Sequence, residues 1–475
     1  MIGDELTYRI LRTFGHVPTD EQRQAVGVFA RFMTEDASRR PVMLMRGSAG
    51  TGKTSLAAAM VRALLSLRQK LVLMAPTGRA AKVFSLYAGH AAFTVHRRIY
   101  RQQSLEGGFS LNFNSARDTL FIVDEASMVS NADSTLLDDL VSFVYSGQGC
   151  RLMLIGDAAQ LPPVGEQNSP ALQASVLAAY GLSVSQCDLS EVLRQSAQSG
   201  ILYNATLLRT ALAPRADAAP SRIVLPKIRF DGFADIRVVP GDELIETLAT
   251  SYARAGTDDT IVVTRSNRRA NIYNQGIRNT VLDREDELCR GDQLMVVKNN
   301  YSASADALPS SLQYVANGDR CVVQRVRNIH EMHGFRFAEL TLRFPDYDDA
   351  ELTTLALLDT LTSEAPALTH EQQQQLFESV MADYSDIPLK RDRLAKLKSD
   401  RYYNALQVKF AYAVTCHKAQ GGQWAHVYID QGYMTDDMLT PDYLHWLYTA
   451  FTRATQQLYL VNWPAAQTAS PADSA

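Results

Sequence analysis

The sequence lacks the features that mark secreted and membrane-spanning proteins. It has 5 cysteines in 475 residues. They stand singly, without a Cys-x-x-Cys pair or histidines at ligand spacing, which argues against a disulfide framework and a zinc site. No segment approaches the roughly 18 consecutive apolar residues that span a bilayer, and the N-terminal residues do not form a signal peptide. We therefore expect a soluble protein of the reducing cytoplasm, without a membrane partner.

Positive charge is not in excess either. The formal net charge is -4, so any nucleic-acid site has to be a local groove rather than a globally basic surface. The densest basic run, residues 390–401 (KRDRLAKLKSDR), is interrupted by Asp and Leu and suits a solvated helix face.

Length and composition indicate a multi-domain globular protein. A chain of 475 residues is too long for one hydrophobic core, and a length-based prior gives two to four folding units. Hydrophobic residues make up 46% and charged residues 21%, as in ordinary globular domains. The last dozen residues, 464–475, lack periodicity and are expected to form a flexible tail.

A phosphate-binding loop is the strongest motif in the chain. An apolar strand, Val42 to Met45, leads into residues 47–54 (GSAGTGKT), and a helical pattern follows to Leu67. Glycines allow backbone N–H groups to surround phosphates at the positive end of a helix. This pattern predicts that Lys53 binds the β- and γ-phosphates of ATP and that Thr54 binds Mg²⁺. The predicted nucleotide-binding residues of this loop are Gly47, Gly50, Thr51, Gly52, Lys53, Thr54 and Ser55.

Two later strands end in residues that complete such a site. Residues 120–125 (LFIVDE) predict Mg²⁺ binding by Asp124 and general-base catalysis by Glu125. The strand 151–155 is followed by 156–163 (GDAAQLPP), where Gln160 is placed to sense the γ-phosphate. A turn in which Gln160 only satisfies backbone groups is the alternative. The alternation of strands and helices predicts a parallel α/β sheet, with its ligand at the carboxyl ends of the strands.

Taken in order, these segments resemble the superfamily 1 helicases of the RecD-like (1B) branch. Further motifs carry the resemblance: residues 18–22 (PTDEQ), 75–81 (APTGRAA), 93–97 (FTVHR), 189–195 (LSEVLRQ), 413–421 (AVTCHKAQG) and 447–454 (LYTAFTRA). The resemblance implies an ATP-dependent DNA helicase that moves 5′→3′ on single strands and unwinds duplexes. It implies that Gln22 reads the adenine, that Arg194 contacts the γ-phosphate, and that Arg453 acts as an arginine finger.

The resemblance also implies a path for single-stranded DNA and for ss/ds junctions. The residues that it places on this path are Pro76, Thr77, Arg79, Thr94, His96, Phe109, Phe113, Lys298, Asn299, Thr415 and His417. Phe109 and Phe113 belong to a hairpin with a Gly-Gly turn, which looks like the pin that separates strands in relatives. Which of the two aromatic rings stacks on a base is left open.

The expected architecture is α/β, with two RecA-like P-loop NTPase domains of parallel sheets, a small β-hairpin insertion and an SH3-like β insertion. The second sheet has no phosphate loop of its own, so one nucleotide is expected between the two sheets. The expected boundaries are 1–96 and 119–209 for the first RecA-like domain, 97–118 for the hairpin, 210–300 and 407–463 for the second RecA-like domain, 301–406 for the SH3-like insertion, and 464–475 for the tail.

Other functions stay open at this point. One alternative is a single-strand translocase that displaces proteins without strong unwinding, and another is a nucleotide-gated DNA clamp with feeble turnover. RNA is an alternative track, because no motif identifies a contact to the 2′-OH. We expect a monomeric motor with possible replication or repair partners.

Overall fold

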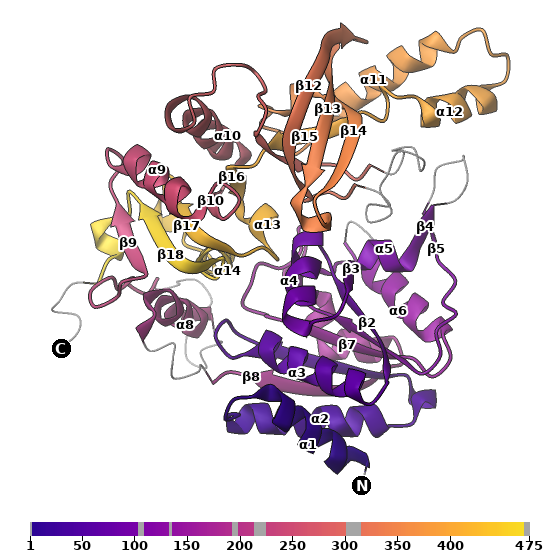
Figure 1. Cartoon of the computed structure of the whole chain (residues 1–475), viewed down its shortest axis with the longest axis vertical. Coiled ribbons are helices and arrows are strands. Elements are labelled where there is room, and N and C mark those ends of the chain that lie inside the picture. The colour runs from indigo at the N-terminus through magenta and orange to yellow at the C-terminus, as the bar shows by residue number, and fades with distance from the viewer. Residues whose placement is uncertain are drawn as a thin grey trace.

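Two parallel sheets, a closed barrel and a small hairpin make up the chain (Figure 1). The computed structural model describes residues 2–102, 109–132, 135–191, 198–212, 225–300 and 315–469. The two sheets confirm the predicted pair of RecA-like domains, and we call them the first and second domains. None of the helices in these ranges is long and apolar enough to cross a membrane.

The first sheet has six parallel strands with helices on both faces. Val42 and Leu44 of β1 point into the core beside α6, whereas Met43 and Met45 pack against α2 and α3, as the two-residue period of a strand requires. In spatial order the strands are β3 (Ala92–Thr94), β2 (Lys70–Ala75), β6 (Thr119–Val123), β7 (Arg151–Gly156), β1 (Pro41–Gly47) and β8 (Ser183–Leu189).

Seven α-helices accompany this sheet in the described residues. They are α1 (Ile2–Phe14), α2 (Asp20–Thr34), α3 (Lys53–Ser66), α4 (Gly78–Ala88), α5 (Val95–Ile99), α6 (Leu136–Ser146) and α7 (Ala174–Ala179). Between α5 and the sheet strand β6, β4 (Tyr100–Gln102) pairs antiparallel with β5 (Phe109–Leu111). This confirms the predicted hairpin, although its Gly-Gly turn lies outside the described residues.

The second sheet has five parallel strands and the same layered construction. In spatial order they are β16 (Ala413–Thr415), β10 (Thr260–Thr264), β17 (Trp424–Asp430), β18 (Ala454–Val461) and β9 (Ile236–Val239). Its helices are α8 (Gly200–Leu212), α9 (Leu244–Ala255), α10 (Asn267–Gly276), α13 (Cys416–Ala419) and α14 (Pro441–Phe451). The expected boundary at residue 209 is wrong, because α8 packs in the core of the second domain through Ile201, Ala205 and Leu208.

The inserted barrel is larger than the segment 301–406. It takes β11 and β15 from sequence expected in the second domain, so it begins before residue 301 and ends after residue 406. Its strands are β11 (Gln293–Val296), β12 (Arg320–Met332), β13 (Phe335–Phe344), β14 (Ala350–Leu357) and β15 (Leu406–Phe410). Two helices, α11 (His370–Asp383) and α12 (Lys390–Ser399), extend beyond it (Figure 1).

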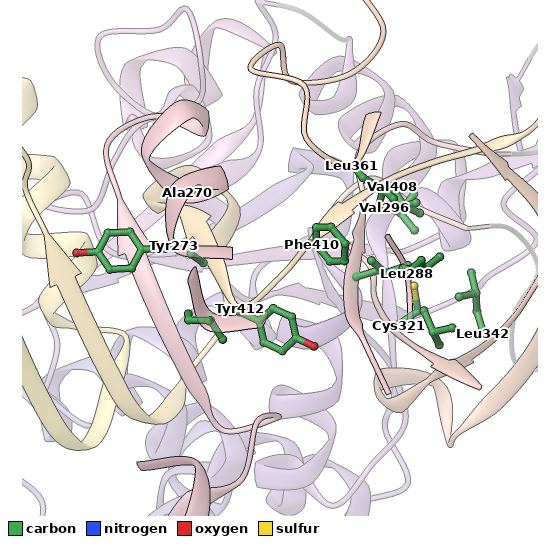
Figure 2. Close-up of a cluster of buried hydrophobic side chains, with 14 of the residues drawn as sticks. Ala270, Tyr273, Leu288, Val296, Cys321, Leu342, Leu361, Val408, Phe410 and Tyr412 are labelled. Carbon is green, nitrogen blue, oxygen red and sulfur yellow. The ribbon is translucent and has the colours of Figure 1, made fainter. Parts of the chain in front are cut away.

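One continuous core joins the barrel to the second domain. Figure 2 shows buried side chains that run from Tyr273 on α10, through Phe410 and Tyr412, to Val296 and Leu342 inside the barrel. Because side chains of both parts belong to this one buried cluster, we expect the barrel to move with the second domain.

The prediction of a flexible tail over residues 464–475 is wrong for residues 464–469. Ala465–Gln467 form a 3-10 turn, and the N–H of Ala469 donates to the carbonyl of Ile228 at 2.8 Å. These backbone hydrogen bonds tie residues 464–469 to the second domain; residues 470–475 lie outside the described residues.

Candidate active site and strand interface

The loop between β1 and α3 has the backbone that a phosphate site requires. Gly50 and Gly52 adopt φ of 79° and 76°, in the left-handed region that glycine tolerates. A Cβ on Gly47 would lie 2.9 Å from the Lys53 side chain and 2.9 Å from Thr51 Oγ1. A side chain at any of these positions would distort the loop, so the glycines keep the N-terminus of α3 open to an anion.

Lys53 is held at the mouth of this loop. Its ammonium donates to the carbonyl of Ser48 at 2.8 Å and lies 3.9 Å from Asp157 Oδ2. Asp157 follows β7, the strand that pairs with β1. The cation therefore faces the place where a triphosphate would sit, with an acceptor on each side.

The two acidic residues after β6 lie beside the loop. Asp124 is half-buried; desolvation first and the neighbouring Glu125 carboxylate second raise its pKa to about 7. The backbone N–H of Glu125 donates to Asp124 Oδ1 at 2.9 Å. A divalent cation stabilises the charged form of a carboxylate placed beside another carboxylate, and Thr54 supplies the hydroxyl that Mg²⁺ prefers in this setting. The donor set therefore fits Mg²⁺.

A cavity of about 450 Å³ lies between the two domains at this point. It is large enough for a bound small molecule, since ligand pockets start near roughly 300 Å³. The predicted site residues that line it are Gly50, Gly52, Lys53, Thr54, Ser55, Asp124, Glu125, Gln160 and Arg453. The structure thus brings together groups from three strand ends of the first domain and one segment of the second.

Arg453 forms part of the second domain's wall of the cavity. It is buried, and its guanidinium donates to the carbonyls of Thr449 (3.0 Å) and Gly422 (3.1 Å) and to the hydroxyl of Thr452 (3.0 Å). These bonds fix the guanidinium within the second domain, at the cavity that the phosphate loop also lines. Arg194, the other arginine that we predicted to touch phosphate, lies outside the described residues.

Gln22 and Gln160 have different surroundings. Both amide ends of Gln22 are engaged, because its Nε2 donates to the carbonyl of Thr51 at 2.9 Å and its Oε1 accepts from the N–H of Thr19 at 3.0 Å. In this conformation Gln22 stabilises the phosphate loop through its hydrogen bond to the Thr51 carbonyl. Gln160 lines the cavity, and its buried Oε1 has no hydrogen-bond partner among the described residues. Gln160 therefore has spare hydrogen-bonding capacity, as a sensor of bound nucleotide needs.

The predicted strand path divides into two cavities and a more distant group. A cavity of about 200 Å³ is lined by Thr77 and Arg79 of the first domain and His417 of the second. A cavity of about 500 Å³ is lined by Thr415 and His417, together with Lys409 and Lys418, which the sequence reasoning missed. The structure thus gathers cations and hydroxyls from both domains, which is the composition expected of a phosphate-binding path.

The two predicted threonines of the first domain also cap helices. Thr77 Oγ1 accepts from the N–H of Ala80, and Thr94 Oγ1 accepts from the N–H of Arg97, both at 3.2 Å. The Thr77 hydroxyl, which accepts such a bond, can still donate its own hydrogen to another acceptor. At Thr77, capping is therefore compatible with a phosphate contact.

The remaining predicted DNA residues lie outside both cavities. Pro76 precedes α4, and His96 lies on α5 with its ring 5.5 Å from that of Tyr100. Lys298 is exposed, and Asn299 Oδ1 accepts from the N–H of Asn317 at 2.6 Å. After the hairpin, Phe113 is 78% exposed, so its ring is available for stacking. The side chain of Phe109 lies outside the described part of the structure.

Comparison with known proteins agrees with this geometry. The family model described as an AAA domain matches residues 19–219, and the model of the UvrD-like helicase C-terminal domain matches residues 410–461. The first match covers the phosphate loop and the second covers Arg453. Over these two segments the chain is similar to an AAA domain and to the C-terminal domain of UvrD-like helicases.

Two curated helicases are similar to parts of this chain. The ATP-dependent RecD2 DNA helicase of Deinococcus radiodurans is 29% identical over 311 residues, which are 64% of this chain and 40% of the relative. The ATP-dependent DNA helicase dda of Enterobacteria phage T4 is 28% identical over 186 residues, 38% of this chain and 40% of the relative. The chain thus matches about 40% of the length of each relative.

Solved Pif1 structures are similar along most of this chain, but their sequence identity to it is lower. A Pif1 helicase from Bacteroides, described in complex with ADP-AlF3 and ssDNA, is 14% identical; the match covers 96% of this chain and 95% of that one, with a TM-score of 0.46.

The sequence reasoning missed several contacts between the two domains. Tyr448, His445 and Gln420 of the second domain bond to the phosphate loop or to residues 157–161 of the first. Arg209 on α8 donates to the hydroxyl of Ser48. A tyrosine, a histidine and an arginine at these places resemble ordinary helix residues, and only the fold shows what they face.

Proposed function

We propose that the chain is an ATP-dependent DNA helicase that moves 5′→3′ on single-stranded DNA and unwinds duplexes, using ATP and Mg²⁺. The observation that carries the proposal is the cavity between the domains, because the phosphate loop lines one side and Arg453 the other. A motor needs this division, since only a nucleotide contacted from both domains ties their separation to hydrolysis.

Each residue at the cavity has a defined part in this proposal. Lys53 and the loop N–H groups hold the β- and γ-phosphates, while Thr54 and Asp124 hold Mg²⁺, which neutralises developing charge on the phosphates. Glu125 accepts a proton from the attacking water. Arg453 stabilises negative charge on the transferred phosphoryl group from the opposite domain.

The strand path connects this chemistry to movement. Thr77 and Arg79 belong to the first domain, and Thr415 and His417 belong to the second. His417 lines one cavity with Thr77 and Arg79 and the other cavity with Thr415. When the nucleotide cleft closes, the two halves of the path approach each other. If each half grips backbone phosphates in turn, the chain advances along the strand.

Strand-dependent hydrolysis tests the proposal. ATPase activity is measured without nucleic acid, with poly(dT) and with poly(rU), and streptavidin displacement is measured from biotin at either end of a poly(dT) strand. We expect stimulation by poly(dT) and faster displacement from the 3′ end. A nucleotide-gated clamp would show little ATP turnover with any strand. Stronger stimulation by poly(rU) than by poly(dT) would indicate that the chain moves on RNA.

A further inference from the structure

Tyr448 connects the second domain directly to the phosphate loop. It lies on α14 and is 1% exposed. Its hydroxyl accepts a hydrogen bond from the N–H of Ala49 in the loop at 2.9 Å and donates one to Asp157 Oδ2 at 2.5 Å. One buried hydroxyl of the second domain therefore joins two segments of the first that carry nucleotide-site residues.

Asp157 extends this connection to the catalytic lysine. Its Oδ2 atom, which accepts from Tyr448, also lies 3.9 Å from the ammonium of Lys53. Its Oδ1 atom accepts from the N–H of Ala159 at 3.0 Å, which fixes the carboxylate in the turn after β7. Asp157 Oδ2 accepts the hydrogen bond from Tyr448. A movement of Lys53 therefore changes the positive charge next to that accepting atom.

The bonds around Tyr448 show that the turn after β7 is attached to the second domain at several points. His445 Nδ1 contacts the carbonyl of Ala159 at 2.8 Å, and the N–H of Leu161 donates to Thr449 Oγ1 at 2.7 Å. Gln420 Nε2 donates to the carbonyl of Leu161 at 2.8 Å. Gln160 lies inside this attached turn, so the orientation of its side chain depends on the second domain.

We propose that Tyr448 is a positioning residue that couples the phosphate loop to closure of the cleft. Its hydroxyl holds Ala49 and Asp157 in the arrangement of the closed cleft, and separation of α14 from the first domain breaks both hydrogen bonds. This inference rests on the proposed function, because it supplies the link by which strand binding at the second domain reaches the nucleotide site.

Tyr448→Phe tests the proposal, with Tyr443→Phe as the matched control. Tyr443 is also buried on α14, but its hydroxyl donates to Gln431 within the second domain. The loss of one hydrogen bond to a charged group corresponds to roughly a tenfold change in an equilibrium. We expect Tyr448→Phe to raise the KM for ATP about tenfold and to lower the ratio of poly(dT)-stimulated to basal kcat. Tyr443→Phe should leave both quantities unchanged.

Domain closure gives a second readout that requires neither DNA nor turnover. Donor and acceptor dyes on the exposed faces of α2 and α9 report the distance between the domains by energy transfer, with and without AMP-PNP. We expect AMP-PNP to shift the distance in wild type and Tyr443→Phe, and to shift it less in Tyr448→Phe. Asp157→Asn, which keeps the shape but weakens the acceptor, should resemble Tyr448→Phe.

Wild-type closure and poly(dT) stimulation in Tyr448→Phe would overturn the inference. Absence of poly(dT) stimulation in the wild-type protein would instead overturn the proposed function. The closure measurement would still test Tyr448 in that case, because it uses AMP-PNP alone.

Discussion

Arg79 stacks on Trp424 across the boundary between the two domains, with its guanidinium carbon 4.8 Å from the centre of the indole. The same guanidinium donates to the carbonyl of Gln423 and lies 3.6 Å from Asp259 of the second domain and 3.9 Å from Asp346 of the barrel. Arg79 was predicted as a DNA contact. In this conformation it is also the point where three parts of the chain meet.

Arg79→Ala should therefore weaken the assembly of the domains. The stacking and the partly buried ion pairs together are worth about 1–2 kcal/mol. We expect the free energy of unfolding, measured with urea, to fall by about that amount. Arg31→Ala, which removes an exposed arginine from α2, is the control for charge. Equal unfolding curves for both variants would show that the junction contributes no stability.

Lys53→Ala should abolish ATP hydrolysis and leave strand binding largely intact. The ammonium is placed at the phosphate loop, whereas the two strand cavities are lined by other residues. Steady-state ATPase and fluorescence anisotropy of labelled poly(dT) measure the two properties separately. ATP turnover at the wild-type rate in this variant would contradict the assignment of the loop as the nucleotide-binding site.

Glu125→Gln should separate ATP binding from hydrolysis. The amide keeps the shape of the side chain but cannot accept a proton from water, and the loss of a general base typically lowers a rate by about 10²–10⁴. We expect mant-ATP to bind with an affinity close to that of wild type while kcat falls at least about a hundredfold. A variant that keeps most of its kcat would show that another group activates the water.

Strand binding should weaken as the pH rises through about 8. Burial lowers the pKa of Lys409 to about 8; burial first and the nearby Lys409 charge second lower that of Lys418 to about 8. The protonated amines are the form that contacts phosphate, so positive charge is lost between pH 7 and pH 9 instead of near pH 10.5. Lys418→Arg stays charged over this range and should flatten the dependence of poly(dT) affinity on pH. An equally steep dependence in the variant would exclude Lys418 from the path.

Sequence reasoning predicted the structure correctly where one short segment forms all of it. The strand, loop and helix around Lys53 are contiguous, and Asp124 and Glu125 follow directly from one apolar strand. Both groups could be placed because the carboxyl ends of parallel strands lie at the same edge of a sheet.

The interdomain contacts could not be found in this way. Ala49 and Tyr448 are 399 residues apart in the chain, and no local pattern marks the tyrosine as a partner of the loop. The extent of the barrel was hard to predict for the same reason, because β11 and β15 pair although a long insertion separates them in the sequence. Long-range pairing of this kind depends on the whole fold and not on local periodicity.

Unwinding of tailed duplexes tests the central claim most directly. Fluorescent duplexes with either a 5′ or a 3′ single-stranded tail are mixed with the protein, ATP and Mg²⁺, and strand separation is followed over time. We predict that the duplex with the 5′ tail opens and the duplex with the 3′ tail does not. ATP hydrolysis stimulated by these strands, without opening of either duplex, would contradict the helicase and favour a translocase.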